Sequence, residues 1–224
     1  MSKNQIIDNN SLSHIIAEKI TEQIITGTLQ PGEKIVETVY AEEFGTSRAP
    51  VREALYLLTI EGLVERIPRK GAVVKGYSEA EIRNLLEIRM LLESLAMKRI
   101  AENGVETELL QVMIDLLQEM KRNKEDIEAY ALLNQKFHNC IISMGESEII
   151  KNMYARLGRP LLSLQRISFL GERNIDKSVQ EHQEIVKKLE ENEIAAATEI
   201  LVRHNEESMK RIEVHLKDNL VTSG

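Results

Sequence analysis

Three histidines and one asparagine in the second half of the chain have the residue types of a metal site. Asn134 and His138 are four residues apart, so they share one face if that segment is helical. His182 and His204 lie in later segments. Three imidazole nitrogens and one amide oxygen, brought together from three helices, could bind a transition metal and leave coordination positions open. Polar pairs at this spacing are common, however, and spacing alone favours ordinary core or surface histidines.

Two arginines in the first quarter of the chain have a spacing that suits contacts to phosphate or to base edges. Arg48 and Arg52 are four residues apart and follow Ser47, a good residue type for a helix N-cap. Two guanidinium groups on one face, beside the positive end of a helix, can bind phosphates and the acceptor edge of guanine. The alternative is a surface helix with solvated arginines.

Composition and charge limit the functions open to this chain. A net charge of −7 over 224 residues does not favour charge-driven binding of nucleic acid. Residues 48–75 nevertheless carry six basic and three acidic side chains, and a modest basic patch suits a site-specific binder. No apolar run reaches membrane-spanning length, the start has no signal-peptide pattern, and the one cysteine cannot form an internal disulfide. We therefore expect a cytoplasmic protein with no membrane partner.

Three helices and a tight turn would position the two arginines. Helically spaced apolar residues predict a first helix from Ser11 to Gly27, after a polar segment of residues 1–10 that we expect to be disordered. A short second helix ends at Gly45, which can adopt the left-handed conformation that terminates a helix. The third helix begins at Ser47, directly before the arginines.

Two short apolar-rich strands follow these helices. They span residues 63–67 and 72–74 and flank the turn Pro68-Arg69-Lys70-Gly71. Three helices and a hairpin, with a three-residue turn between the second and third helices, are typical of a winged helix-turn-helix. In that fold the third helix enters the major groove of DNA, and the hairpin wing lies along the backbone or the minor groove.

The segment from Pro31 to Gly71 resembles the DNA-binding domain of GntR-type bacterial repressors. The residues that carry the resemblance are Pro31-Gly32, Glu37, Ala41-Glu42, Gly45 to Leu55, Glu61 to Val64 and Pro68 to Gly71. The resemblance implies that the recognition helix and the wing contact operator DNA through Thr38, Ser47, Arg48, Arg52, Arg69, Lys70 and Gly71. Thr38 stands where some relatives have a DNA-contacting arginine, which implies a different operator preference. Val36 stands where the family often has a helix-capping serine.

The rest of the chain is predicted to be an antiparallel helical bundle. Ser78 with Glu81 forms a capping box that begins a helix, and the apolar spacing stays helical from there to the C-terminus. About six helices with short connections imply antiparallel packing. The fold class is therefore mainly α, with a winged helix-turn-helix domain over residues 9–77 and an all-helical domain over residues 78–218.

Three local features of the bundle can also be predicted. The first helix would bury a stripe made of Leu85, Ile88, Leu92 and Leu95. The fourth helix, over residues 147–170, would be kinked near Gly158-Arg159-Pro160. Ser178 with Glu181 would cap the fifth helix.

The bundle is similar to the FCD domain, the effector domain of the FadR-like subgroup of GntR regulators. Its hallmarks are an Asp or Asn four residues before a His, then a Glu-His pair, and then a His on the final helix. They correspond here to Asn134 with His138, to Glu181-His182 and to His204. In relatives the four matching residues bind a divalent metal and the effector completes its coordination. The resemblance thus implies a metal site of Asn134, His138, His182 and His204, with zinc or nickel favoured by the three histidines.

Two residues of the bundle qualify this interpretation. Asn134 stands where Asp is more frequent, and a neutral amide oxygen is a weaker ligand than a carboxylate, so we expect a lower metal affinity. Arg89 resembles a residue at the start of the FCD domain and could bind a carboxylate of the effector bidentately. The alternative for Arg89 is a solvated side chain or a pair with Glu93, four residues on.

These observations lead to a one-component transcriptional regulator, more specifically a repressor. A homodimer would bind an operator that forms an inverted repeat, because two-fold protein symmetry imposes two-fold symmetry on the DNA. A small carboxylate bound in the bundle would shift the dimer away from the DNA-competent geometry. One alternative is a regulator without a metal that responds to an acyl ligand. The other is a metal-dependent hydrolase, for which Glu181 is the only adjacent candidate base. We favour a protein that is not an enzyme.

Overall fold

The computed structural model describes the backbone of residues 3–221 and the side chains of residues 12–217. The chain divides into two compact units, one up to Ala80 and one from Glu81 on. The described residues form ten helices and a small three-stranded sheet, so the prediction of a mainly helical fold is confirmed. No helix within residues 3–221 is long and apolar enough to cross a membrane.

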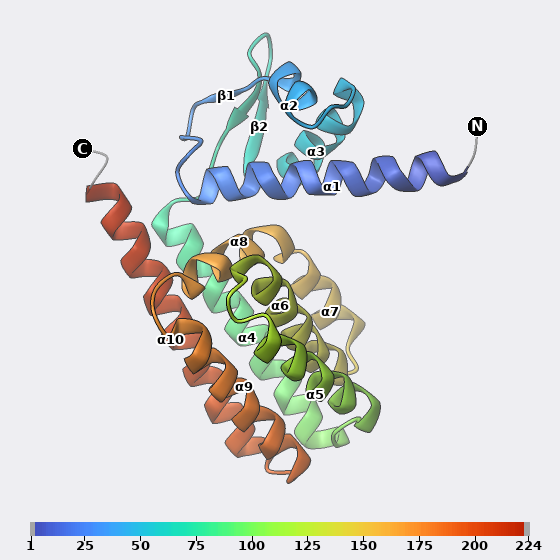
Figure 1. Ribbon diagram of the computed structural model, residues 1–224, viewed down its shortest axis with the longest axis vertical. Helices are drawn as coiled ribbons and strands as arrows, with labels where there is room; N and C mark the ends of the chain where they lie inside the picture. The colour runs from blue at the N-terminus through green and yellow to red at the C-terminus, as the bar shows by residue number, and fades with distance from the viewer. Residues whose placement is uncertain (1–2, 222–224) are drawn as a thin grey trace. The chain divides into compact units, whose positions relative to one another are not determined.

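The N-terminal unit is a winged helix-turn-helix, as predicted (Figure 1). Its elements are α1 (Lys3–Ile25), β1 (Lys34–Ile35), α2 (Glu37–Glu43), α3 (Arg48–Ile60), β2 (Val64–Ile67) and β3 (Gly71–Val74). The strands are antiparallel in the order β1-β3-β2, and Ile67 pairs with Gly71 at the end of the hairpin. α1 packs against α3, where Ile16, Ile20 and Leu55 are fully buried.

The turn between α2 and α3 has the geometry that the sequence predicts. Gly45 takes a φ of +57°, a conformation that is costly for residues with a side chain. The N–H of Thr46 donates to the carbonyl of Ala41 at 2.8 Å, which closes the end of α2. This turn sets the orientation of α3 relative to α2, and with it the position of Arg48 and Arg52.

Two predictions for this unit need correction. α1 begins at Lys3, so the backbone of residues 3–10 is helical where disorder was expected, and residues 1–2 lie outside the described residues. Strand β1 was missed because two residues are too few to show an alternating pattern.

The segment from Lys75 to Tyr77, which follows the hairpin, is hydrogen-bonded to the N-terminal unit. The N–H groups of Lys75 and Gly76 both donate to the carbonyl of Leu63, at 2.9 and 3.1 Å. The hydroxyl of Tyr77 donates to the carbonyl of Glu61 at 2.6 Å. The helix that follows, α4, begins only two residues after Tyr77.

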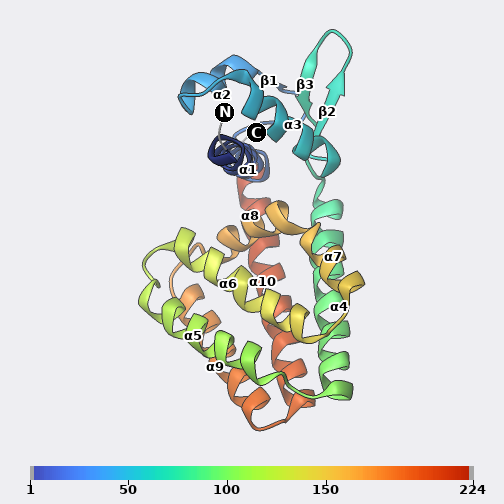
Figure 2. The same ribbon diagram turned by 90° about the vertical axis from the view of Figure 1, so that its right-hand side faces the viewer.

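The second unit is a bundle of antiparallel and crossing helices (Figures 1 and 2). Its helices are α4 (Glu79–Asn103), α5 (Thr107–Arg122), α6 (Ile127–Met144), α7 (Glu148–Ala155), α8 (Gly158–Phe169), α9 (Asn174–Glu190) and α10 (Ile194–Val221). α9 and α10 lie side by side, and α8 contacts both α6 and α10. The described part of the bundle thus has seven helices where about six were predicted.

The additional helix arises where a kink was predicted. α7 ends at Ala155 and α8 begins at Gly158, with Pro160 in its first turn. Proline has no N–H to donate and its ring clashes with the carbonyl four residues earlier, so one helix cannot continue through this point. The following helix also differs from the prediction: α9 begins at Asn174, so Ser178 and Glu181 lie within it and do not cap it.

The buried face of α4 is the most consequential correction. Ile88 and Leu95, which were predicted to face the core, are 42% and 40% exposed. The helix instead turns Arg89 and Glu93 inward, in line with Leu86 and other apolar residues of the same face. A pattern of apolar residues cannot reveal this orientation, because the two charged side chains are buried against each other.

Candidate nucleic-acid interface and metal centre

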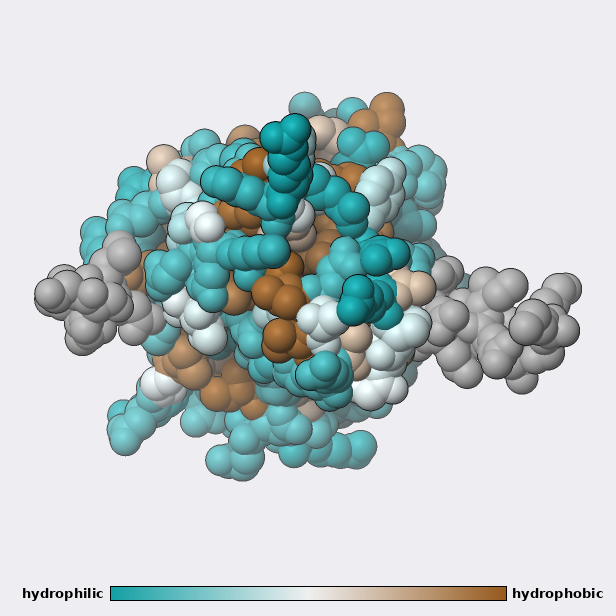
Figure 3. All heavy atoms as spheres, turned by 90° about the horizontal axis from the view of Figure 1, so that it is seen from above, coloured by the Kyte–Doolittle hydropathy of each residue, from teal (hydrophilic) through white to brown (hydrophobic). Residues whose placement is uncertain are grey.

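The wing and the start of α3 enclose a basic groove of about 690 Å³. Five of the residues that were predicted to contact DNA line this groove. They are Thr38 of α2, Arg48 of α3, and Arg69, Lys70 and Gly71 of the wing. Gly71 and Arg69 both take positive φ values, which fold the tip of the wing. The face of the molecule seen in Figure 3 is largely hydrophilic, with hydrophobic patches near its centre.

The two remaining predicted contacts lie on the exposed side of α3. Ser47 occupies the N-cap position, but its side chain accepts no hydrogen bond from the helix. The hydroxyl is therefore not used for capping. Arg52 is exposed, and its Nε donates to Glu37 Oε2 at 2.8 Å.

Two further basic residues of the groove were missed. Lys34 and Arg66 line it beside the predicted residues. Lys34 belongs to the two-residue strand β1, which left no signal in the sequence. Arg66 is exposed on β2, next to the exposed Glu65 and the half-buried Ile67, and the strand prediction included it.

The structure brings the three bundle histidines together in the core. His138 of α6, His182 of α9 and His204 of α10 are buried, and one ring nitrogen from each lies within 4.8 Å of the others. His138 Nε2 and His182 Nε2 are 3.3 Å apart. Two nitrogens about 2.0–2.1 Å from one tetrahedral ion are separated by about 3.3–3.4 Å. The observed spacing is therefore the one that two ligands of a single ion would have.

Asn134 supplies an unused acceptor on the same face of α6. Its side chain is buried, and Oδ1 has no hydrogen-bond partner among the described residues. A buried oxygen without a donor is costly unless something binds it. The donor set of three imidazoles and this amide oxygen fits a late first-row divalent ion better than magnesium or calcium.

Burial keeps the histidines neutral and so able to bind a metal. It lowers the pKa of His138 to about 4, lowers that of His182 well below its usual value, and lowers that of His204 although Glu181 opposes the change. The charge of Arg89 also lowers the pKa of all three rings. Its guanidinium contacts the same oxygen of Glu93 that lies 3.2 Å from His138 Nδ1. At neutral pH each ring therefore has one nitrogen with a free lone pair.

The carboxylate of Glu181, which was predicted to help cap its helix, orients one of these rings. Glu181 Oε2 is 2.7 Å from His204 Nδ1, on the side where α9 and α10 meet. Burial would raise the pKa of Glu181, but the contact with His204 together with the charges of Lys177 and Arg211 outweighs it, and the pKa is lowered. An ionised carboxylate can only accept, so Nδ1 of His204 carries the hydrogen and Nε2 stays free as a ligand.

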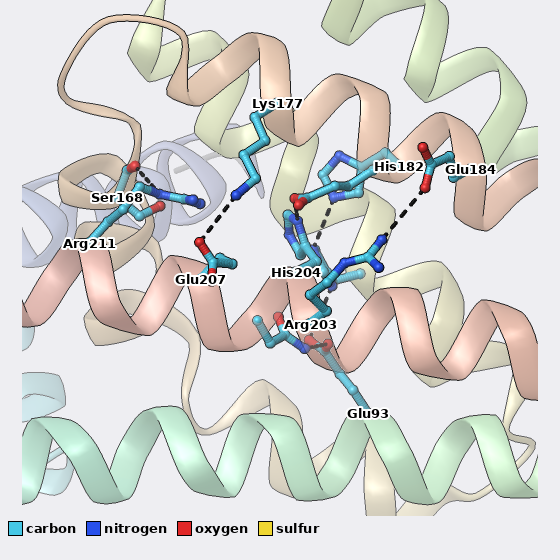
Figure 4. A network of polar contacts seen from close by, with 12 residues as sticks. Glu93, Ser168, Lys177, His182, Glu184, Arg203, His204, Glu207 and Arg211 are labelled. Atoms are coloured by element: carbon cyan, nitrogen blue, oxygen red, sulfur yellow. Dashed lines mark hydrogen bonds and ion pairs between the residues drawn. The ribbon is translucent and has the colours of Figure 1, made fainter.

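A second carboxylate, Glu93 of α4, lies beneath the histidines (Figure 4). Its Oε1 accepts from Arg89 Nε at 2.9 Å and from the Tyr154 hydroxyl at 2.8 Å, and its Oε2 accepts from Asn205 Nδ2 at 2.7 Å. The same Oε1 lies 3.2 Å from His138 Nδ1, without the alignment of a hydrogen bond. Burial would raise the pKa of Glu93, but the charge of Arg89 together with the contacts that Arg89 and His138 make with the carboxylate outweighs it, and the pKa lies well below the usual range.

The Arg89–Glu93 pair leaves part of the arginine unused. Arg89 is buried, and its Nη2 has no hydrogen-bond partner among the described residues. Gln165 of α8 is also buried with both amide atoms unpaired, and α8 contacts the helices that carry His138 and His204. These unsatisfied donors and acceptors are what a polar ligand in the bundle would need.

Comparison with known proteins identifies the two units. Residues 12–74 match the family described as bacterial regulatory proteins, gntR family, and residues 84–207 match the FCD domain. The chain belongs to the GntR family of regulators with an FCD domain. It is a DNA-binding transcriptional regulator and not an enzyme, which sets aside the hydrolase alternative.

Two relatives and one solved structure illustrate this membership. An uncharacterized HTH-type transcriptional regulator, YdhC of Bacillus subtilis (strain 168), is 27% identical over 206 residues, which cover 90% of this chain and 92% of YdhC. A gluconate operon transcriptional repressor of the same organism is 31% identical over 144 residues, 63% of this chain and 58% of the repressor. The structure of E. coli McbR/YncC has the same fold, with a TM-score of 0.69 at 20% identity over 92% of this chain and 98% of that chain.

The buried pair of Arg89 and Glu93 in this GntR regulator predicts how substitutions change the free energy of unfolding. Glu93→Leu leaves the guanidinium of Arg89 buried without a counter-charge and should lower the free energy of unfolding by about 3–5 kcal/mol. Arg89→Met combined with Glu93→Leu removes both charges and should recover most of that loss. Tyr154→Phe, which removes one hydrogen bond to the carboxylate, is the milder control at about 1.5–3 kcal/mol. Urea denaturation followed by circular dichroism measures all three, and a double variant as unstable as Glu93→Leu would contradict the explanation.

Proposed function

We propose that this GntR regulator is a repressor whose helical unit binds a divalent metal and a small carboxylate that releases it from its operator. The observation that carries the proposal is the buried histidine cluster with Arg89 beside it. The sequence boundaries fit this division, with residues 9–77 as the DNA-binding domain and residues 78–218 as the metal- and effector-binding domain. A protein that acts on the chromosome would work in the cytoplasm.

The groove and the exposed side of α3 would form the DNA interface. Arg48 and Arg52 would contact base edges and phosphates in the major groove, with Ser47 and Thr38 beside them. Arg69, Lys70 and Gly71 would place the wing on the minor groove or the backbone. The unused hydroxyl of Ser47 supports this role, because a phosphate can take the place of the missing cap contact.

The protein would bind DNA as a homodimer through the solvent side of α4. Three large apolar side chains, Ile88, Leu91 and Leu95, recur at helical spacing there and are exposed. The neighbouring helix α7 exposes Ile149 and Met153 one turn apart. Rows of exposed apolar residues on adjoining helices are typical of protein interfaces. A second copy of the chain would cover them and supply the second recognition helix.

The metal would be held by Asn134, His138, His182 and His204, with zinc or nickel as the best-suited ions. A bound ion would offer open coordination positions to the oxygens of an acid. Nη2 of Arg89 would donate to the same carboxylate, while Glu93 holds the other end of the guanidinium. A metal-free regulator with an acyl ligand would leave the close grouping of His138, His182 and His204 without a purpose.

DNA selection tests the first half of this function. Sites that the full-length protein selects from random duplexes should form an inverted repeat, because a two-fold dimer presents two recognition helices. Arg48→Ala should weaken discrimination at one position of each half-site by about 1–3 kcal/mol. Fluorescence anisotropy with the selected duplex measures this loss. Arg159→Ala, in the helical unit, is a control for the loss of one positive charge, and selected sites without two-fold symmetry would contradict the dimer.

Metal analysis tests the second site. The purified chain should hold about one zinc or nickel ion, measured by inductively coupled plasma mass spectrometry, and His138→Ala and His204→Ala should lose it. Glu181→Gln should lower metal affinity about 10–100-fold, because the orientation of His204 is lost. Glu184→Gln is the matched control, since Glu184 lies on the same helix but contacts Arg203 at the surface. Full occupancy that survives both histidine substitutions would refute this site.

Operator binding in the presence of organic and sugar acids tests the switch. One relative is named for repression of a gluconate operon, which supports a repressor role here and places sugar acids first among those to try. The active acid should weaken operator binding of the metal-loaded protein. Arg89→Met combined with Glu93→Leu, which leaves no buried charge unpaired, should abolish that response while the protein still binds its operator. If no acid alters binding under metal-replete conditions, the carboxylate switch is wrong.

A further inference from the structure

Glu37 lies at the DNA-facing surface although its charge opposes DNA binding. It is the first residue of α2, and its Oε2 accepts from Nε of Arg52 on α3 at 2.8 Å. The side chain of Arg52 is 59% exposed and that of Glu37 is 29% exposed. A carboxylate beside phosphates is repulsive, so its presence next to the recognition helix requires a reason.

Stability of the fold does not provide that reason. Ion pairs between exposed side chains contribute little to stability, because water and salt screen the charges. α2 and α3 are already joined by the Gly45 turn and by packing of apolar residues. The pair therefore concerns the position of Arg52 itself.

The contact uses one particular edge of the guanidinium. Arginine has five N–H donors in a rigid planar fork, and here the carboxylate takes the Nε–H. The Nη groups stay available and are fixed in direction, because rotation about the side chain would break the contact with Glu37. Two parallel N–H donors are the arrangement that reads N7 and O6 of guanine.

We propose that Glu37 is a positioning residue that holds the Nη donors of Arg52 for bidentate recognition of one guanine in each half-site. The free side chain of arginine has much rotational entropy, and a prior contact lowers the entropy that binding must remove. This inference rests on the proposed base contact of Arg52. Glu37 thus acts on sequence discrimination through Arg52 and touches no base.

The test compares five variants of the full-length chain on a selected operator duplex and on duplexes with single base-pair changes. Arg52→Ala should lose about 5–150-fold in discrimination at one base pair of each half-site. Glu37→Ala should lose about 5-fold at the same base pair, and the double variant should be no worse than Arg52→Ala, since coupled residues are not additive. Glu37→Gln should retain part of the discrimination, because its amide oxygen still accepts from Nε.

A second readout separates positioning from simple repulsion. Loss of one negative charge should raise affinity for unrelated DNA in Glu37→Ala, while discrimination falls. Glu42→Gln, which removes a charge from the exposed side of the same helix, should raise non-specific affinity to a similar degree and keep discrimination intact. A rise in affinity for unrelated DNA together with a fall in discrimination in Glu37→Ala is specific to a positioning role.

Three results would overturn the inference. If Glu37→Ala bound all duplexes more tightly to the same degree, Glu37 would act only by repelling the DNA phosphates. Losses of Glu37→Ala and Arg52→Ala at different base pairs, or losses that add in the double variant, would show independent action. If Arg52→Ala kept full discrimination, the proposed base contact would be wrong and this inference would fail with it. If Arg52→Ala lost discrimination and Glu37→Ala did not, the base contact would stand and only the role of Glu37 would be wrong.

Discussion

The helical unit depends on the carboxylate of Glu93, which is buried where four helices converge. It accepts hydrogen bonds from Arg89 on its own helix, from Tyr154 of α7 and from Asn205 of α10, and it lies beside His138 of α6. Taking a carboxylate and a guanidinium out of water costs several kcal/mol each, and only direct pairing with further hydrogen bonds offsets that cost. The helices must therefore meet in one arrangement, because any shift would leave a buried charge without its partners. Since His138 is neutral at pH 7, Arg89 is the cation that keeps Glu93 ionised.

The same requirement organises the polar atoms around the histidines. Glu93 satisfies one end of Arg89, and Glu181 satisfies Nδ1 of His204. The atoms left without partners among the described residues include Nη2 of Arg89 and Oδ1 of Asn134, which have opposite preferences. The first needs an acceptor such as an acid, and the second needs a cation or a donor. A metal with a carboxylate ligand would satisfy both, which is why the two proposed ligands are more plausible together than either one alone.

The sequence predicts features that depend on neighbouring residues and fails where distant residues decide. The Gly45 turn and the interruption near Pro160, which was predicted as a kink, follow from the conformational limits of glycine and proline. The start of α3 directly after Ser47 was predicted too, although the Ser47 hydroxyl makes no capping hydrogen bond. The histidine cluster could be predicted only through resemblance to a known domain, because its three helices are far apart in sequence. The pair of Arg89 with Glu93 was among the alternatives that the spacing offered, whereas Tyr154 and Asn205 gave no usable signal. The apolar pattern of α4 predicted that Ile88 and Leu95 face the core, whereas Arg89 and Glu93 do so. A buried charge is stable only with partners that the fold supplies, and the local sequence does not show those partners.

Both arginines at the proposed ligand sites are held in the same way but in different surroundings. In each, a glutamate accepts from Nε, at 2.8 Å for Arg52 and 2.9 Å for Arg89, so that the Nη end is left for another partner. At the surface, water screens the pair, and a DNA base needs only to bind donors that are already directed outward. In the core the pair is strong, so a ligand that displaced Glu93 would leave a buried carboxylate uncompensated. An acid in the bundle must therefore add to the existing pair through Nη2, which limits it to a molecule small enough to fit beside Glu93.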